Sequence, residues 1–140
     1  MIFMKALDNI KKKQSRKAGT KAYYNKGEVY FSRLFGYALV DGVYMPIPEY
    51  ANAMKLVFSM LNTGSSLPSI KQKLDTEGYR DSSHNRYCLS RIESLVRPIY
   101  AGYLEKGISF VKVNNLIPIV SLQEYRSAAR ALRKEIAKIR

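Results

Sequence analysis

Residues 34–50 read LFGYALVDGVYMPIPEY, an apolar stretch that follows one of the most basic segments of the chain. Its runs YALV and VYMP flank Asp41-Gly42. This pair is typical of a two-residue type I′ turn, because Asp tolerates a positive φ and Gly has no Cβ to resist it. Directly afterwards, Pro48 fixes φ near the helical value and Glu49 places negative charge in a first helical turn. The stretch therefore predicts a β-hairpin that leads straight into a helix.

Two amphipathic helices are expected after this hairpin. Over residues 49–62, apolar side chains recur at positions i, i+4, i+7, i+8 and i+11, which predicts one buried helix face made of Tyr50, Met54, Val57, Phe58 and Leu61. Gly64 is the expected end of this helix. Ser65 or Ser66 can cap a second, short helix with a proline in its first turn, which Gly78 would end.

A third helix is predicted from about Cys88 to Arg97, after the polar loop GYRDSSHNR. Its expected inner side consists of Leu89, Ile92, Leu95 or Val96, and Ile99. Its expected outer side consists of Ser90, Arg91, Glu93, Ser94 and Arg97. Pro98 should end this helix near Arg97, because a proline disfavours helical backbone in the residue before it. We expect the three helices to meet in a core that contains Phe58, Leu74, Ile92 and Leu95.

The rest of the chain combines short β-like runs with one long helix. The runs IYAGYL, ISFVKV and LIPIV are rich in branched and aromatic residues, and we expect them to extend the hairpin into a small antiparallel sheet. Over residues 121–140, Ser121 and Glu124 form a capping box before an apolar stripe of Tyr125, Ala128 or Ala129, Leu132, Ile136 and Ile139. The expected fold class is α+β, mainly helical, with a helix-turn-helix-like pair and a small antiparallel sheet.

Composition and charge limit the possible functions. The chain has 140 residues with 46% hydrophobic content, which fits one domain with a sizeable core. Lys and Arg number 24 against 11 Asp and Glu, so the net charge is +13, which favours a polyanionic partner. No apolar run approaches the ~20 residues of a membrane-spanning helix, and MIFMKAL is too short for a signal peptide. We therefore expect a soluble intracellular protein.

The first 26 residues are expected to form a basic arm ahead of a domain at 27–140. They carry eight basic residues against Asp8 alone: Lys5, Lys11, Lys12, Lys13, Arg16, Lys17, Lys21 and Lys26. Phe3, Leu7 and Ile10 recur at helical spacing, so the arm should start as a helix. So dense a set of like charges repels itself unless an anion is near, which favours nucleic-acid binding. A solvated surface helix is the alternative.

Few residues suit catalysis or metal binding. His84 is the single histidine and lies in a polar loop, where a surface or phosphate-facing role is expected. Cys88 is the single cysteine, and its place beside Leu89 suggests a buried thiol. Together they lack the further ligands that zinc requires, and no glycine-rich phosphate loop followed by lysine is present. We expect no catalytic residue, no metal and no cofactor in this chain.

The two short helices around the loop at 78–86 suggest a helix-turn-helix with a long turn. In such a motif the first helix braces the second, whose polar side chains reach base edges while flanking basic groups bind phosphates. This pattern and the net charge favour DNA binding. An RNA- or ribosome-associated basic domain is the leading alternative, and a protein-interaction domain whose charge serves only solubility is the third.

Six pieces of the sequence together resemble the recombinase domain of the large serine recombinases, the phage-integrase and transposon-resolvase type. In order, they are FGY at 35–37, P-x-P-E-Y-A at 46–51, V-F at 57–58, TGSSLPSIKQKLDTEGY at 63–79, YCLSRIESLVRPIYAGYL at 87–104 and IPIVSLQEYRSA at 117–128. The resemblance covers about residues 15–130. It implies a targeting module that binds duplex attachment-site DNA during integration or recombination, in the bacterial or phage-infected cytoplasm. It also implies an upstream catalytic domain as partner and a monomer in isolation.

The resemblance also assigns parts of the chain. Phe3 to about Lys17 would be the tail of the helix that connects to the catalytic domain, and Lys21 to Leu34 the linker along the DNA. The nucleophilic serine with its arginine cluster and the cysteine-rich zinc ribbon have no counterpart here, so we expect a non-catalytic middle segment. Tyr87 stands where family members often carry Trp, and RDSSHNR replaces a glycine-rich basic loop.

The expected DNA contacts fall into three groups. The arm should bind phosphates, the loop should contribute two arginines, and the helix from about Cys88 to Arg97 should enter the major groove. In that helix, Arg91 is expected to pair with a guanine edge and Arg97 to meet phosphate. The full set is Lys11, Lys12, Lys13, Arg16, Lys17, Lys21, Arg80, Arg86, Ser90, Arg91, Ser94 and Arg97.

Overall fold

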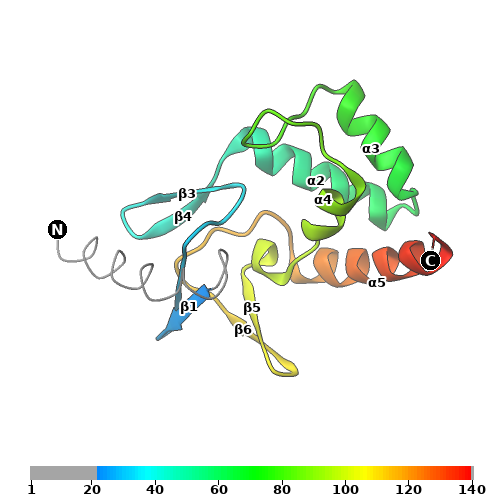
Figure 1. Ribbon diagram of the computed structural model, residues 1–140. Coiled ribbons are helices and arrows are strands. Elements are labelled where there is room, and N and C mark those ends of the chain that lie inside the picture. The colour runs from blue at the N-terminus through cyan, green and yellow to red at the C-terminus, as the bar shows by residue number, and fades with distance from the viewer. Residues whose placement is uncertain (1–21, 140) are drawn as a thin grey trace.

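The structure is a computed structural model that describes residues 22–139 (Figure 1). In chain order its elements are β1 (Ala22–Asn25), β2 (Glu28–Phe31), β3 (Tyr37–Val40), β4 (Val43–Pro46), α2 (Pro48–Asn62), α3 (Leu67–Thr76), α4 (Leu89–Ser94), the 3₁₀ helix η1 (Pro98–Ala101), β5 (Tyr103–Lys106), β6 (Ser109–Lys112) and α5 (Leu122–Ile139). This mixture of helices and short antiparallel strands confirms the expected α+β class.

The β3–β4 hairpin and the helix after it form as predicted. Tyr37 pairs with Pro46 and Val40 with Val43. The turn residues Asp41 and Gly42 have φ values of 50° and 80°, the two positive values that a type I′ turn requires. The hairpin then leads directly into α2, which begins at Pro48.

Helices α2, α3 and α4 pack around a common core. The predicted serine cap of α3 is Ser66, whose Oγ accepts a hydrogen bond from the backbone N–H of Ser69 at 3.3 Å. Phe58, Leu74 and Ile92 are fully buried, and Leu95 is 1% exposed. All four belong to one hydrophobic cluster, as expected for a junction of three helices.

The third helix is shorter than predicted. Instead of reaching Arg97, α4 ends at Ser94. The N–H groups of Leu95 and Val96 donate to carbonyls three residues earlier, which tightens the last turn. Arg97 is extended at φ −132° and ψ 145°, as the residue before a proline prefers. The predicted inward side is also wrong at Leu89, which is 36% exposed.

The strands do not join into one sheet, which corrects a second expectation. Three separate two-stranded hairpins form, β1–β2, β3–β4 and β5–β6. After Pro98, the run expected as a strand begins with the 3₁₀ helix η1. The run LIPIV contributes only one isolated parallel bridge, between Leu116 and Tyr44, and Pro118 in this run has no N–H to continue a ladder.

The β1–β2 hairpin is an element that the sequence analysis did not predict. Lys26 and Gly27 form its turn, both with positive φ, so the hairpin spans the expected boundary between arm and domain. Val29 is fully buried and Phe31 is 4% exposed, so β2 belongs to the core. Residues 22–31 of the linker expected over 21–34 therefore form this hairpin.

The side chain of Asn115 joins β2 to the β3–β4 hairpin. This residue is 3% exposed. Its Oδ1 accepts from the Val29 N–H at 2.9 Å, and its Nδ2 donates to the Val29 carbonyl at 2.8 Å. Nδ2 also lies 3.3 Å from the carbonyl oxygen of Gly42, and the Asn115 carbonyl accepts from the Tyr44 N–H. One amide thus satisfies backbone groups of two hairpins.

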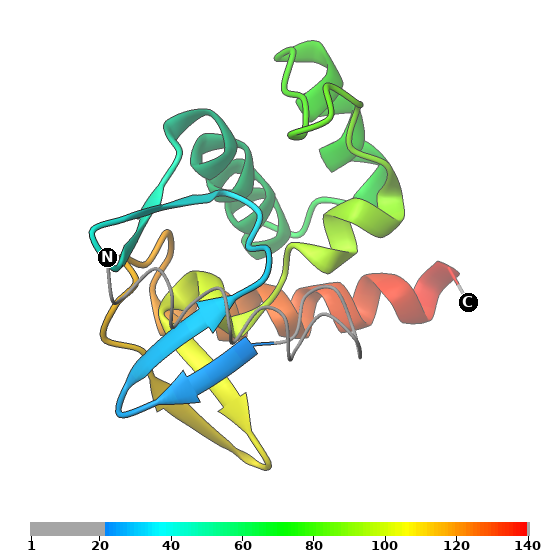
Figure 2. The same cartoon turned by 60° about the vertical axis from the view of Figure 1, so that its left-hand side comes forward.

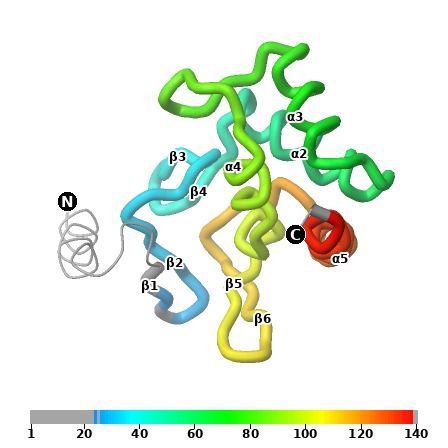
Figure 3. Tube along the Cα trace, turned by 45° about the vertical axis from the view of Figure 1, so that its right-hand side comes forward, coloured from blue at the N-terminus to red at the C-terminus, as the bar shows by residue number. Residues whose placement is uncertain are grey.

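Helix α5 closes the fold by packing along α2 and η1. The predicted capping box is present, because Glu124 N–H donates to Ser121 Oγ and Ser121 N–H donates to Glu124 Oε1, both at 3.0 Å. Figures 2 and 3 show β1–β2 and β5–β6 together at the end of the domain away from α3. Lys106 of β5 lies over the Tyr24 ring of β1, 4.5 Å from its centroid. None of the described helices is long and apolar enough to cross a membrane.

Candidate nucleic-acid interface

A groove of about 980 Å³ opens between the segment before β3 and the loop before α4. One side comes from residues 33–37 and the start of α2, and the other from residues 81–88 and the outer face of α4. Its lining residues with polar or charged side chains are Arg33, Tyr37, Tyr50, Asp81, Ser82, Ser83, Asn85, Arg86, Cys88, Arg91, Ser94, Arg97 and Tyr100.

The groove is strongly basic. Four arginines line it, Arg33, Arg86, Arg91 and Arg97, against one carboxylate, Asp81. Arg33 and Arg86 are exposed, whereas Arg91 and Arg97 are half-buried. Oδ1 of Asp81 accepts from the backbone N–H groups of two loop residues, each at 2.9 Å, so this carboxylate shapes the loop. A cleft lined by one sign of charge attracts ligands of the opposite sign, here an anion.

Arg91 is held in the wall of the groove by aromatic packing. Its guanidinium carbon lies 4.5 Å from the centroid of the Phe35 ring. That ring also packs against Tyr50 at 5.0 Å and Tyr87 at 6.2 Å between centroids. The Nε of Arg91 is buried and has no hydrogen-bond partner among the described residues. Phe35 therefore fixes the plane of the guanidinium, which leaves its terminal nitrogens as the groups able to meet a ligand.

Two buried tyrosines hold the backbone on both sides of the groove. Tyr87 OH donates to the Arg80 carbonyl at 3.3 Å, and Tyr100 OH donates to the Phe35 carbonyl at 3.0 Å. Burial raises the pKa of both phenols, although the nearby positive charge of Arg91 acts in the opposite direction. Both side chains are therefore neutral near pH 7 and act as structural anchors.

The predicted burial of Cys88 is wrong. The thiol is exposed and lines the groove, because Tyr87 takes the buried position before α4. Its Sγ lies 3.3 Å from Ser90 Oγ. This hydrogen bond and the backbone N–H of Arg91 lower the pKa of the thiol.

The structure brings together part of the predicted DNA-binding set. Arg86, Arg91, Ser94 and Arg97 line the groove. Ser94 is exposed, and its Oγ donates to the Arg91 carbonyl at 2.6 Å. Ser90 is exposed but does not line the groove, and Nη1 of the half-buried Arg80 donates to the Tyr79 carbonyl at 2.9 Å.

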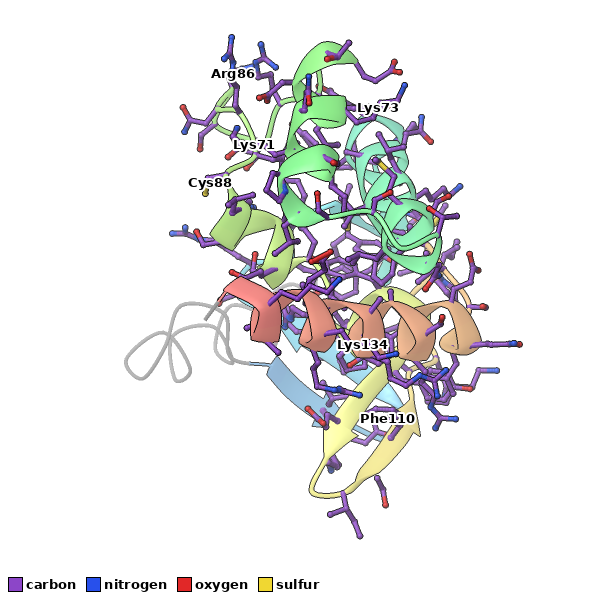
Figure 4. The ribbon with its side chains drawn as sticks, turned by 90° about the vertical axis from the view of Figure 1, so that its right-hand side faces the viewer. Lys71, Lys73, Arg86, Cys88, Phe110 and Lys134 are labelled. Carbon is purple, nitrogen blue, oxygen red and sulfur yellow. The ribbon has the colours of Figure 1, made fainter. Side chains whose placement is uncertain are left out.

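The arm residues cannot be placed in this site. Lys11, Lys12, Lys13, Arg16, Lys17 and Lys21 lie outside the described residues. Figure 4 shows Arg86 and Cys88 on the segment before α4, in the upper part of the view, whereas Lys134 lies on α5 below them.

Sequence reasoning missed the opposite wall of the groove. Arg33 and Phe35 line it, and the signal was their position, since Arg33 lies two residues before the FGY motif and Phe35 is its first residue. Gly36 lets this wall approach the core, because its φ is +93° and a Cβ there would collide with Cε of Met54. The carbonyl of Gly36 also accepts from the Ile47 N–H at 2.8 Å, which ties the wall to the start of α2.

Metal-ligating side chains are not clustered in the described part of the chain. Among residues 22–139, no group of three or more His, Cys, Asp or Glu side chains is placed to hold a metal ion. His84 is exposed at the loop with φ 63°, in agreement with the surface position expected for it. The side chains that line the groove are mainly basic or able to form hydrogen bonds.

Solved structures of other proteins share this fold, and two of them come from DNA recombination systems. One is a large serine recombinase in complex with DNA, with a TM-score of 0.59 and 20% identity over 91% of this chain. The other comes from work on the sequence requirements of the Listeria innocua prophage attP site, with a TM-score of 0.61 and 20% identity over 90% of this chain. This chain spans 38% and 51% of the length of those two chains. No family model and no curated protein matches the sequence.

Proposed function

We propose that this chain is the DNA-binding domain of a large serine recombinase and that it binds duplex attachment-site DNA during integration or recombination. The observation that carries the proposal is the groove with four arginines, which lies beside α4 on a fold shared with a recombinase solved on DNA. The order of six sequence pieces that resemble the recombinase domain supports the same family.

We assign each side chain to a phosphate or to a base of the DNA according to its position in the groove. Arg33 and Arg86 are exposed on opposite walls and suit two phosphates of the DNA backbone. Helix α4 has six residues, a length of about 9 Å, so base reading is confined to a few positions. Arg91 is the candidate for a guanine edge, because Phe35 holds its forked donors in one plane.

The other proposed DNA contacts involve the two serines of α4, Arg97, Arg80 and the basic arm. We propose that Ser90 and Ser94 accept or donate hydrogen bonds on the outer side of α4 and that Arg97 meets phosphate. Arg80 would contribute from the loop after releasing its bond to the Tyr79 carbonyl. The arm would follow the backbone through Lys11, Lys12, Lys13, Arg16, Lys17 and Lys21, as its charge density suggests.

A matched pair of double variants tests this assignment. Arg33→Ala with Arg86→Ala removes two groove charges, and Arg130→Ala with Lys134→Ala removes two from α5, which lines a different cavity. Fluorescence anisotropy with a labelled inverted-repeat duplex should show a much larger loss of affinity for the groove variant. Equal losses would mean that net charge alone drives binding, and equal competition by RNA of the same length would favour an RNA-binding domain.

The proposal also concerns the full-length recombinase of which this chain would be one segment. An upstream catalytic domain would supply the nucleophile and the contacts for dimers and tetramers, so this segment alone should be a monomer. Such a recombinase would act on DNA in the cytoplasm of a bacterium or of a phage-infected cell. Light scattering during gel filtration tests the monomer, and a stable dimer without DNA would contradict it.

A further inference from the structure

Leu89 is an exposed apolar side chain at the first residue of α4. It is 36% exposed, whereas Tyr87 and Ile92 are fully buried and Leu95 is 1% exposed, so these three fill the core around the helix. A single exposed leucine is common on protein surfaces, so only its position can indicate a function. Here the position is the N-terminal turn of the helix that borders the basic groove.

The exposed side of α4 is uncharged. Besides Leu89, its exposed residues are Ser90 and Ser94. Cys88, directly before the helix, is exposed as well, and Figure 4 shows it at the outer edge of the domain. Glu93, the carboxylate of this helix, is half-buried. An uncharged surface of this kind can approach base edges, while the arginines that line the groove bind the phosphates beside it.

The two exposed serines are poor at distinguishing bases. A hydroxyl group both donates and accepts hydrogen bonds, so it can meet several different base edges. Sequence preference on α4 therefore needs other side chains, and Arg91 is the candidate for a guanine edge. Leu89 is the remaining exposed side chain of the helix, and it forms apolar contacts only. The C5-methyl group of thymine is the apolar group that base pairs present in the major groove.

We propose that Leu89 contacts the C5-methyl group of a thymine in the major groove and contributes to the sequence preference of this domain. The inference rests on the proposed DNA binding and adds a second base-reading residue to Arg91. Two residues correspond to about 200° around an α-helix, so Leu89 and Arg91 lie on different sides of the exposed serines. The two side chains would then read different base pairs.

Replacing thymine by deoxyuridine tests this contact, because the exchange removes only the methyl group. The unmodified chain first selects its preferred duplex from a randomised pool, and each thymine of that duplex is then replaced singly. For at least one thymine, the unmodified chain should bind the thymine duplex about fourfold more tightly than the deoxyuridine duplex, which is the effect expected for burial of one methyl group. Leu89→Ala should bind these two duplexes with equal affinity.

The ratio of the two affinities separates a base contact from a structural role. If Leu89→Ala only disturbed the fold, both duplexes would bind more weakly and the fourfold ratio would remain. Ile108→Ala is the matched control, because it truncates another exposed apolar side chain, one on the β5–β6 turn. This control should keep the full ratio.

The possible failures are distinguishable. A selected duplex in which no thymine responds to the exchange, or an unchanged ratio in Leu89→Ala, would overturn the inference and leave the proposed function intact. An equal loss of the ratio in Ile108→Ala would also overturn it, because the effect would not be specific to α4. If the pool yields no preferred duplex at all, the proposed function and the inference are both contradicted.

Discussion

The guanidinium of Arg91 lies 4.5 Å from the centroid of the Phe35 ring, so a residue of α4 is held by an aromatic side chain from the segment before β3. The contact joins the two walls of the basic groove. A guanidinium stacked on a ring keeps one orientation and still presents its outer donors. The base-reading role proposed for Arg91 therefore depends on Phe35 as well.

Replacing Arg91 should relax sequence preference more than it weakens overall binding. Arg91→Ala should remove discrimination worth about 1–3 kcal/mol at one base position, because a bidentate contact to guanine is lost. Arg91→Lys keeps the charge without the fork and should lose the same preference while retaining more affinity. Selection from a randomised DNA pool measures both. Unchanged base preferences in Arg91→Ala would remove this residue from the readout and point to Arg80 and Arg86.

Truncation of Phe58 should strongly destabilise the domain. Its side chain is fully buried where α2, α3 and α4 meet, so Phe58→Ala should reduce the free energy of unfolding by about 3–5 kcal/mol through lost burial and a residual cavity. Urea unfolding followed by circular dichroism provides the measurement. Leu89→Ala is the control, since this side chain is 36% exposed, and it should cost less than about 1 kcal/mol. Similar losses for both variants would contradict the described core.

Asn115 should matter more for stability than its size suggests. Asn115→Ala would leave the buried N–H and carbonyl of Val29 without partners, at about 1–3 kcal/mol for each group. We expect a loss of at least about 2 kcal/mol in urea unfolding and faster amide exchange at Val29. Asn114→Ala is the matched control, because the hydrogen bond from residue 114 to Gly27 uses its backbone N–H. A loss for Asn115→Ala no larger than for this control would mean that water replaces the amide.

Local patterns in the sequence predicted those elements whose signals lie within a few residues. Asp41-Gly42 specifies the β3–β4 turn, Ser66 caps α3, and the capping box of Ser121 and Glu124 starts α5. Each of these signals involves contacts that are close along the chain. The burial of Phe58 was predictable for a similar reason, since helical periodicity fixes which side chains share a face.

Features that depend on distant contacts were not predictable in the same way. The β1–β2 hairpin is tied to the fold by Asn115, a residue 86 positions from Val29. The groove pairs the segment at 33–37 with the loop at 81–88, so Arg33 could not be recognised as a neighbour of Arg86. The apolar pattern continues beyond Ser94, but α4 ends there. Two i→i+3 hydrogen bonds, from the N–H groups of Leu95 and Val96, tighten the backbone at this point.

The basic arm provides the last prediction, because its proposed role is electrostatic. Lys11, Lys12 and Lys13 are expected to contact phosphates, and each lost contact lowers the slope of log K against log salt by about 0.9. Changing all three to Ala should therefore reduce the magnitude of that slope by up to about 2.7. The variant should also bind all duplex sequences more weakly, and to the same extent. Binding measured from low to moderate salt tests this, with Arg130→Ala/Lys134→Ala/Lys138→Ala on α5 as a control of equal charge. An unchanged slope in the arm variant would identify the arm as solvated surface, and an equally flattened slope in the control would assign the effect to net charge.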